Sequence, residues 1–216
     1  MAQYFRTMLC LWLLAAQGCS TAVPKTFQGL DGSIGQAIFV HPVNKNSNQA
    51  RLSLWQKEGH GWCRLFLVSA VIGKNGLAPA GEKKEGDGKT PSGTYSLGPA
   101  FGYESSINTG LLYRQATDID FWVDDVHSMQ YNQWVSGPPT ANSFERMKRR
   151  DNLYQYGIVI RYNMHPVIHG AGSAIFIHVW RRYYSPTAGC VALNQRYLRK
   201  ILSWLGQQYK PVIILE

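Results

Sequence analysis

Apolar and polar residues alternate along much of the chain from about Phe27 onward, in runs separated by short polar turns. In residues 50–58, for example, Leu52, Leu54 and Gln56 recur on one side with a period of two. That period is typical of a β-strand with one buried face. We predict strands at 36–40, 50–58, 62–73, 94–98, 119–125, 157–163, 173–180 and 211–216.

A helical period appears only near the C-terminus, over residues 194–206. Asn194 is a favourable N-cap for this helix, and Gly206 is a residue type at which helices end. The apolar face of the predicted helix consists of Tyr197 or Leu198, Ile201, Leu202 and Leu205.

A second, short helix is predicted at 142–150, where Asn142 and Glu145 have the spacing of a capping box. Residues 73–76 indicate a tight turn with glycine at positive φ, and residues 81–93 a polar, glycine-rich loop. The chain shows no internal repeat and no clear linker. We therefore predict one mainly β domain over residues 23–216, a sandwich or barrel with one or two packed helices.

The first 22 residues differ from the rest, with Arg6 near the start, no acidic residue, and an apolar stretch at 8–16. The stretch is too short to span a bilayer and fits a secretory signal peptide over 1–22. Two alternatives stay open: cleavage after Ala22, or a lipoprotein signal with Cys19 as the lipidated residue. Both predict export to the periplasm or cell envelope, and the second adds attachment to the membrane by a lipid anchor.

Export leaves Cys63 and Cys190 in the mature chain, too few for a disulfide scaffold. Cys63 lies in an apolar run, which predicts a small hydrophobic residue in the core. The alternative is a disulfide between Cys63 and Cys190.

The formal net charge is +9, which suits an anionic partner. An exported protein rarely meets nucleic acid, so we expect a cell-wall polymer or membrane surface and no nucleic acid. Solubility alone is the other interpretation of the charge. We expect a monomer.

His178 ends a predicted strand, and Cys190 follows twelve residues later, directly after Gly189. A cysteine nucleophile needs a base to take its proton, and an imidazole fixed at the end of a strand can do so. The backbone N–H groups of Gly189 and Cys190 can converge on an oxyanion, and a helix starting near Asn194 would favour the thiolate. From the spacing alone, a satisfied core histidine and a packed thiol are an equal alternative.

Longer stretches around these residues support the enzymatic interpretation. Residues 187–193, "TAGCVAL", residues 85–97, "EGDGKTPSGTYSL", and residues 170–180, "GAGSAIFIHVW", together resemble the L,D-transpeptidase catalytic domains of the YkuD type. The resemblance spans about residues 36–193. It implies an L,D-transpeptidase-like fold with Cys190 as nucleophile and His178 as base, and with Gly189 and Cys190 forming the oxyanion hole.

The chain departs from the family pattern at two positions. Ala188 stands where many members have a second histidine, although its backbone carbonyl can still orient an imidazole. Ala192 replaces a frequent arginine, a loss for which Arg181 or Arg182 would compensate unless both are solvated loop charges.

The resemblance implies acyl transfer on peptidoglycan stem peptides, at the L,D bond of a tetrapeptide donor, through a thioester. An amine acceptor would make the protein a transpeptidase, and water would make it an L,D-carboxypeptidase. A catalytically dead, basic wall-binding protein is the non-enzymatic alternative.

Other candidate binding residues are Trp180, which shares a strand face with His178, and Tyr131 and Asn132 in a polar, aromatic stretch. That stretch is otherwise a surface loop with aromatic anchors, in which the roles of Asp124 and Asp125 stay open.

A zinc site is the competing chemistry. His165 and His169 are four residues apart, a spacing that suits zinc on a helix, and His178 follows them. Pro166 and Gly170 favour a loop instead, and no glutamate accompanies the pair. We therefore expect no metal and no other cofactor.

Overall fold

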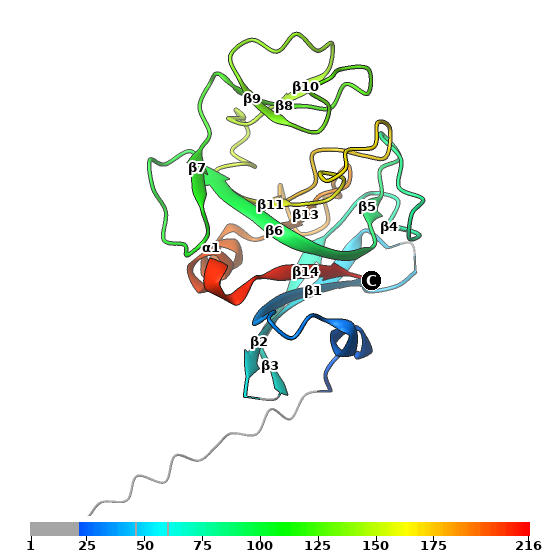
Figure 1. The fold of residues 1–216 in the computed structure, drawn as a ribbon, viewed down its shortest axis with the longest axis vertical. Coiled ribbons are helices and arrows are strands. Elements are labelled where there is room, and N and C mark those ends of the chain that lie inside the picture. The colour runs from blue at the N-terminus through cyan, green and yellow to red at the C-terminus, as the bar shows by residue number, and fades with distance from the viewer. Residues whose placement is uncertain (1–21, 46, 60) are drawn as a thin grey trace, which may run out of the picture.

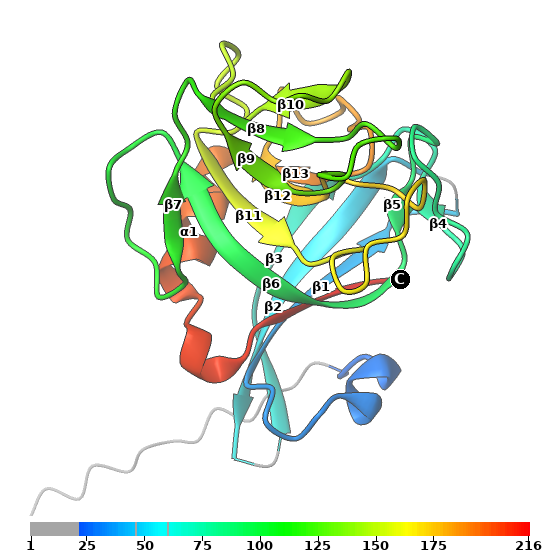
Figure 2. The same cartoon turned by 45° about the horizontal axis from the view of Figure 1, so that its top comes forward.

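The structure is a computed structural model that describes residues 22–45, 47–59 and 61–216. The predicted signal peptide, including Cys19, lies outside these residues except for Ala22. Within them, a nine-stranded sheet curls round until β11 also pairs with β6, which closes it into a barrel (Figures 1 and 2). Its strands are, in spatial order, β11 (Tyr156–Ile160), β12 (Phe176–Val179), β13 (Val191–Leu193), β3 (Gly61–Val71), β2 (Gln49–Glu58), β1 (Gln36–Pro42), β14 (Val212–Leu215), β6 (Gly93–Gly102) and β7 (Tyr113–Gln115).

The smaller elements lie around this barrel. The remaining strands are β10 (Phe144–Arg146), β8 (Asp120–Val123) and β9 (Trp134–Ser136) in a three-stranded sheet, and the pair β4 (Leu77–Ala78) and β5 (Thr90–Pro91). The helices are α1 (Gln195–Trp204) and the 3₁₀ turns η1 (Lys25–Gly29) and η2 (Gln207–Tyr209). Each predicted strand is present, and the mainly β architecture is confirmed.

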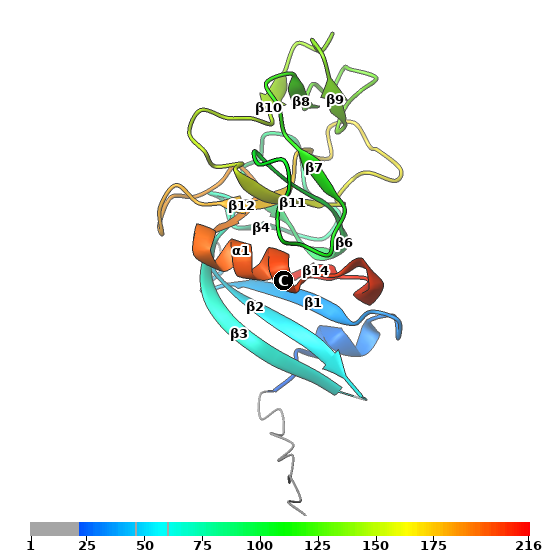
Figure 3. The same cartoon turned by 90° about the vertical axis from the view of Figure 1, so that its left-hand side faces the viewer.

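The single α-helix of the described residues follows the predicted pattern closely. The Asn194 side chain accepts a hydrogen bond from the N–H of Arg196, so the predicted N-cap is confirmed. The helix ends at Trp204, two residues before Gly206. Leu198, Ile201 and Leu202 are buried against the sheet, and burying each contributes roughly 1.5–3 kcal/mol. Figure 3 shows the helix lying along one side of the barrel.

The predicted helix at 142–150 is wrong, because residues 144–146 form β10 at the edge of the three-stranded sheet. Phe144 pairs with Val123, and its ring meets the Phe121 ring edge-on at 5.0 Å between centroids. The ladder to β8 and this aromatic contact outweigh the local capping signal, since propensity is a weak prior. The three-stranded sheet lies above the barrel, at the top of Figure 1.

Strand β3 is less buried than its apolar sequence predicts. Leu65 and Leu67 are 47% and 46% exposed. The reason is that β13 pairs only with Ala70 and Val71, so that the first part of β3 has the β2 strand on one side alone. The turn at 73–76 is confirmed, with Gly76 at a φ of 74°.

The cysteine predictions need correction. Cys63 is disulfide-bonded and only half-buried, so it is not a small hydrophobic residue of the core. Cys190 is a free, buried thiol, so the alternative of a Cys63–Cys190 disulfide is wrong. Of the helices in the described ranges, none combines the length and apolar character needed to cross a membrane.

Candidate active site

His178 and Cys190 lie on neighbouring parallel strands. In the register of β12 and β13, Ile177 pairs with Val191 and His178 with Ala192, so Cys190 lies beside Phe176, one step earlier. Because side chains alternate along a strand, His178 and Cys190 face the same side of the sheet. Residues on the other face, such as Ile177, pack toward α1.

The thiol is buried and hydrogen-bonded to the backbone. Cys190 is 7% exposed, its Sγ donates to the Ala174 carbonyl at 3.2 Å, and the Phe176 N–H donates to Sγ at 3.4 Å. Burial raises the pKa of the thiol to about 12. Strand β13 separates Cys190 from α1, so the positive end of the helix is not beside the sulfur as the sequence suggested. The resting cysteine is therefore protonated.

The imidazole is oriented for proton acceptance. His178 Nδ1 lies 2.8 Å from the Val179 carbonyl oxygen, which can only accept, so Nδ1 carries the proton and Nε2 is left as the basic nitrogen. Burial lowers the pKa of His178 to about 4, which keeps the ring neutral at pH 7. The Tyr154 ring meets the imidazole edge-on at 5.2 Å, which holds it in place.

Both residues line one cavity of about 200 Å³. Trp180 and Arg181, expected near the substrate, also line it, and Arg181 forms an ion pair with Asp151 at 3.2 Å. Ala188 lines it too, at the position where the family pattern often has a histidine.

Sequence reasoning missed three residues in this cavity, Glu145, Arg149 and Tyr154. The Tyr154 hydroxyl donates to Glu145, and burial raises the pKa of that carboxyl. Arg149 stacks over the Tyr154 ring at 5.0 Å and pairs with Asp151 at 2.8 Å. Glu145 and Arg149 fall within the incorrectly predicted helix at 142–150, and Tyr154 lies just beyond it. The sequence carries no local signal that would bring these residues to Cys190.

Gly189 is fixed by close packing. A Cβ at Gly189 would lie 3.0 Å from the Lys89 carbonyl oxygen and 3.2 Å from Ile175, so a side chain would push the loop outward. The Gly189 N–H donates to the Thr187 hydroxyl at 3.2 Å, and that hydroxyl donates to the Cys190 carbonyl at 2.6 Å. The glycine N–H is therefore engaged locally and must be released before it can bind an oxyanion.

Tyr131 and Asn132 support the site from behind. Both are buried, and the Asn132 Oδ1 accepts from the Ala174 N–H at 3.1 Å. The Tyr131 hydroxyl donates to Glu85 and accepts from the Gly172 N–H at 3.1 Å. Both residues bind the segment that contains Ala174, whose carbonyl accepts the hydrogen bond from the thiol. Neither residue lines the 200 Å³ cavity.

A second, smaller cavity of about 110 Å³ meets the first at Cys190, Ala188 and Glu145. Asp124 lines it, with an Oδ1 that is buried and has no hydrogen-bond partner among the described residues. Asp125 instead binds the N–H groups of His127 and Asn142.

Neither His165 nor His169 of the zinc alternative lines the two cavities at Cys190. His169 Nδ1 lies 2.6 Å from the Val126 carbonyl oxygen, and its ring stacks on Tyr131. In the part of the chain that the structure describes, no group of three or more His, Cys, Asp or Glu side chains could hold a metal ion.

Comparison with known proteins places the chain. No curated protein matches it. Among solved structures it is similar to that of Bdellovibrio bacteriovorus Bd1075, with a TM-score of 0.45 and 15% identity over 85% of this chain and 48% of that chain. The chain thus spans about half the length of that protein. It also matches the YkuD family of L,D-transpeptidase catalytic domains over residues 46–214. Because this match covers well over half of its residues, the chain belongs to the L,D-transpeptidase catalytic domain family.

Proposed function

We propose that the protein is an L,D-transpeptidase that acts on peptidoglycan stem peptides, with Cys190 as nucleophile and His178 as general base. The observation that carries the proposal is the pairing of β12 and β13, which puts a free thiol and a neutral imidazole on one face of the sheet in one cavity. A neutral histidine with Nε2 unprotonated is the form that a general base requires.

In the first half-reaction, the Cys190 proton moves from Sγ to His178 Nε2 while Sγ attacks the carbonyl of the L-centre before the terminal D-residue. The new S–C bond gives a tetrahedral oxyanion, to which the Cys190 N–H and the released Gly189 N–H would donate hydrogen bonds. One such donor contributes roughly 3 kcal/mol. The C–N bond then breaks, and the proton on Nε2 goes to the leaving D-amino acid.

In the second half-reaction, an acceptor amine gives a proton to Nε2 and attacks the thioester. The S–C bond then breaks, and the proton on Nε2 returns to Sγ to regenerate the thiol. Water in place of the amine would give the carboxypeptidase outcome.

The pKa values of Cys190 and His178 in the substrate-free protein indicate that the thiol loses its proton only when substrate is bound. With the thiol near 12 and the imidazole near 4, an ion pair does not form beforehand. Proton transfer must accompany attack, and the thiol must leave its hydrogen bond to Ala174. When a peptide binds in the cavity, the thiol would give up this hydrogen bond and turn toward the scissile carbonyl.

The test is mass spectrometry of disaccharide-tetrapeptides incubated with the protein. We expect release of D-alanine and a dimer linked between two third residues. Cys190→Ala and His178→Ala should each abolish both products, while His127→Ala, an exposed histidine outside the site, should not. Trimmed tripeptide without dimer would identify the carboxypeptidase, and products from Cys190→Ala would refute the assignment.

We also propose that the protein is exported to the cell envelope. The mass of the mature N-terminal peptide separates the two routes: a chain starting at Val23 supports a cleaved signal, and a diacylated Cys19 supports the lipid anchor. A mature chain that retains Met1 would contradict both.

A further inference from the structure

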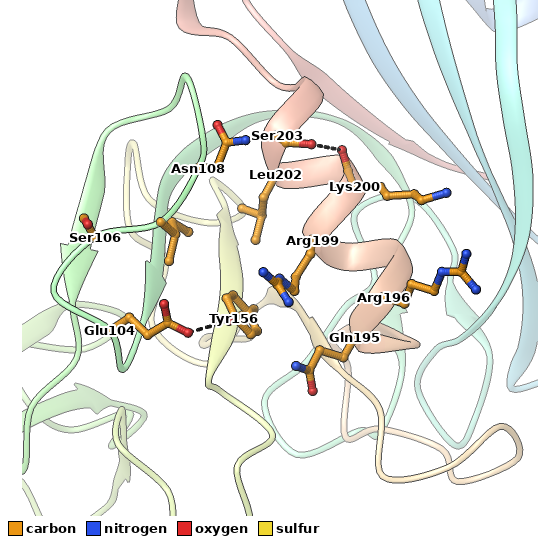
Figure 4. Close-up of a pocket in the computed structure, with 11 residues that line it drawn as sticks. Glu104, Ser106, Asn108, Tyr156, Gln195, Arg196, Arg199, Lys200, Leu202 and Ser203 are labelled. Carbon is orange, nitrogen blue, oxygen red and sulfur yellow. Dashed lines mark hydrogen bonds between the residues drawn. The ribbon is translucent and has the colours of Figure 1, made fainter.

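A wide groove lies away from Cys190, and Cys190 is not part of its lining. It has a volume of about 730 Å³, within the usual range of sites for small ligands. One wall is α1, and the other is the segment between β6 and β7 together with Tyr156 of β11 (Figure 4). Because α1 packs on the face of β12 opposite to His178, the sheet separates this groove from the thiol.

The helical wall is cationic. Arg196, Arg199 and Lys200 line the groove at i, i+3 and i+4, and α1 has no acidic residue in its first turn. Like charges at these spacings repel, and a cation near the N-terminus also opposes the helix dipole. The ion pairs found among the described residues all use other cations, so none of these three side chains is held in an ion pair there.

Arg199 is the cation directed into the groove. Its guanidinium lies over the Tyr156 ring, 5.5 Å from the centroid, and Figure 4 shows it pointing toward that ring. Stacking on the ring leaves the edge of the guanidinium free to form paired hydrogen bonds with a carboxylate. The side chains of Arg196 and Lys200 extend from the helix on the side away from Tyr156 (Figure 4).

The opposite wall carries one acid. The Tyr156 hydroxyl donates to Glu104 at 2.6 Å, which fixes the carboxylate across the groove from Arg199 (Figure 4). A polymer with negative charge all along its length would be repelled by this acid. A short molecule with a carboxylate at one end and an ammonium group at the other would satisfy both walls.

The rest of the lining fits a peptide backbone. Asn108 and Gln195 offer amide donors and acceptors, and Ile107 and Leu202 offer apolar surface. We propose that this groove is a second binding site for a short zwitterionic peptide, with its carboxylate on Arg199 and its ammonium group on Glu104. The site's chemistry is independent of Cys190, whereas the choice of a stem peptide as its natural occupant rests on the proposed function.

The test uses the full chain carrying Cys190→Ala, so that nothing is consumed. The probe is the free stem tetrapeptide, compared with its C-terminal amide and its N-acetyl form. We expect NMR shifts at the Gln195 and Asn108 side-chain amides, and at least a tenfold loss of affinity at this site in Arg199→Gln. The C-terminal amide lacks the carboxylate that Arg199 would bind, so Arg199→Gln should change its affinity little. The N-acetyl peptide lacks the ammonium group that Glu104 would bind, so Glu104→Gln should change its affinity little. Arg51→Gln, an exposed arginine on β2, is the matched control and should bind like the parent.

Three results would overturn the proposal: shifts confined to the surroundings of the substituted cysteine, equal affinity for Arg199→Gln and the parent, or Arg199-dependent binding of inorganic polyphosphate tighter than that of the peptide. The last would show a polyanion site instead. Because catalysis in Arg199→Gln with Cys190 intact is measured separately, failure here is distinguishable from failure of the proposed reaction.

Discussion

Replacing Asn132 with alanine should destabilise the protein strongly and loosen the backbone that holds the thiol. The Asn132 side chain makes four hydrogen bonds: it accepts from Trp122 Nε1 and the Ala174 N–H, and it donates to the carbonyls of Tyr162 and Asn163. Each such bond contributes about 1 kcal/mol net, and partners left buried without one cost more. We therefore expect a loss of about 3–5 kcal/mol in the free energy of unfolding, a large part of the total for a domain.

Backbone conformation must be separated from these bonds. Asn132 has a φ of 58°, a left-handed geometry that alanine adopts at a cost of roughly 1–2 kcal/mol. Asn152 has the same φ of 58° and an exposed side chain, so Asn152→Ala carries the conformational cost alone. The difference between the two variants isolates the hydrogen bonds.

The assay is urea unfolding at pH 7, followed by tryptophan fluorescence and far-UV circular dichroism. Asn132→Ala should unfold at least about 2 kcal/mol more easily than Asn152→Ala, with the same m-value. It should also lower the rate of acyl transfer more than Asn152→Ala does, because the Ala174 carbonyl accepts the hydrogen bond from the Cys190 thiol. Equal stabilities of the two variants within about 0.5 kcal/mol would refute the reasoning.

Three further predictions concern charges and their partners. The folded-state pKa of His178 is lowered to about 4, so the unfolded chain takes up this proton at a higher pH than the folded protein does. The free energy of unfolding should therefore fall by about 3 kcal/mol as pH drops from 6.5 to 4. In urea melts over this pH range, His178→Asn should remove most of the pH dependence, whereas His127→Asn should leave it unchanged. Hydrogen bonds from Ser136, Thr117 and Trp134 hold the pKa of Asp120 well below its usual range. Asp120→Asn should therefore lower stability at pH 7, by a deficit that shrinks as pH falls below about 4, and an unchanged melting temperature at pH 7 would contradict this. Tyr154→Phe keeps the ring against His178 but removes the donor to Glu145, which should cost about 1–2 kcal/mol in urea unfolding, whereas a neutral effect would show that the pair does not stabilise the fold.

The sequence alone determined the elements that depend on near neighbours. Alternation with period two marked the strands, and a capped apolar stripe marked α1. Both signals are local, because the side-chain directions of a strand or helix follow from a few consecutive residues. The residues of the family motifs also carried the family membership, since they lie in a few short stretches of sequence.

Only the tertiary structure decided the character of the site. The pairing of β12 with β13 set His178 and Cys190 on one face, and burial, not a helix end, fixed their protonation. Glu145 lines the cavity of the thiol from a segment whose local capping signal predicted a helix. Burial and pairing sum contributions from residues far apart in the chain, and no local pattern contains them.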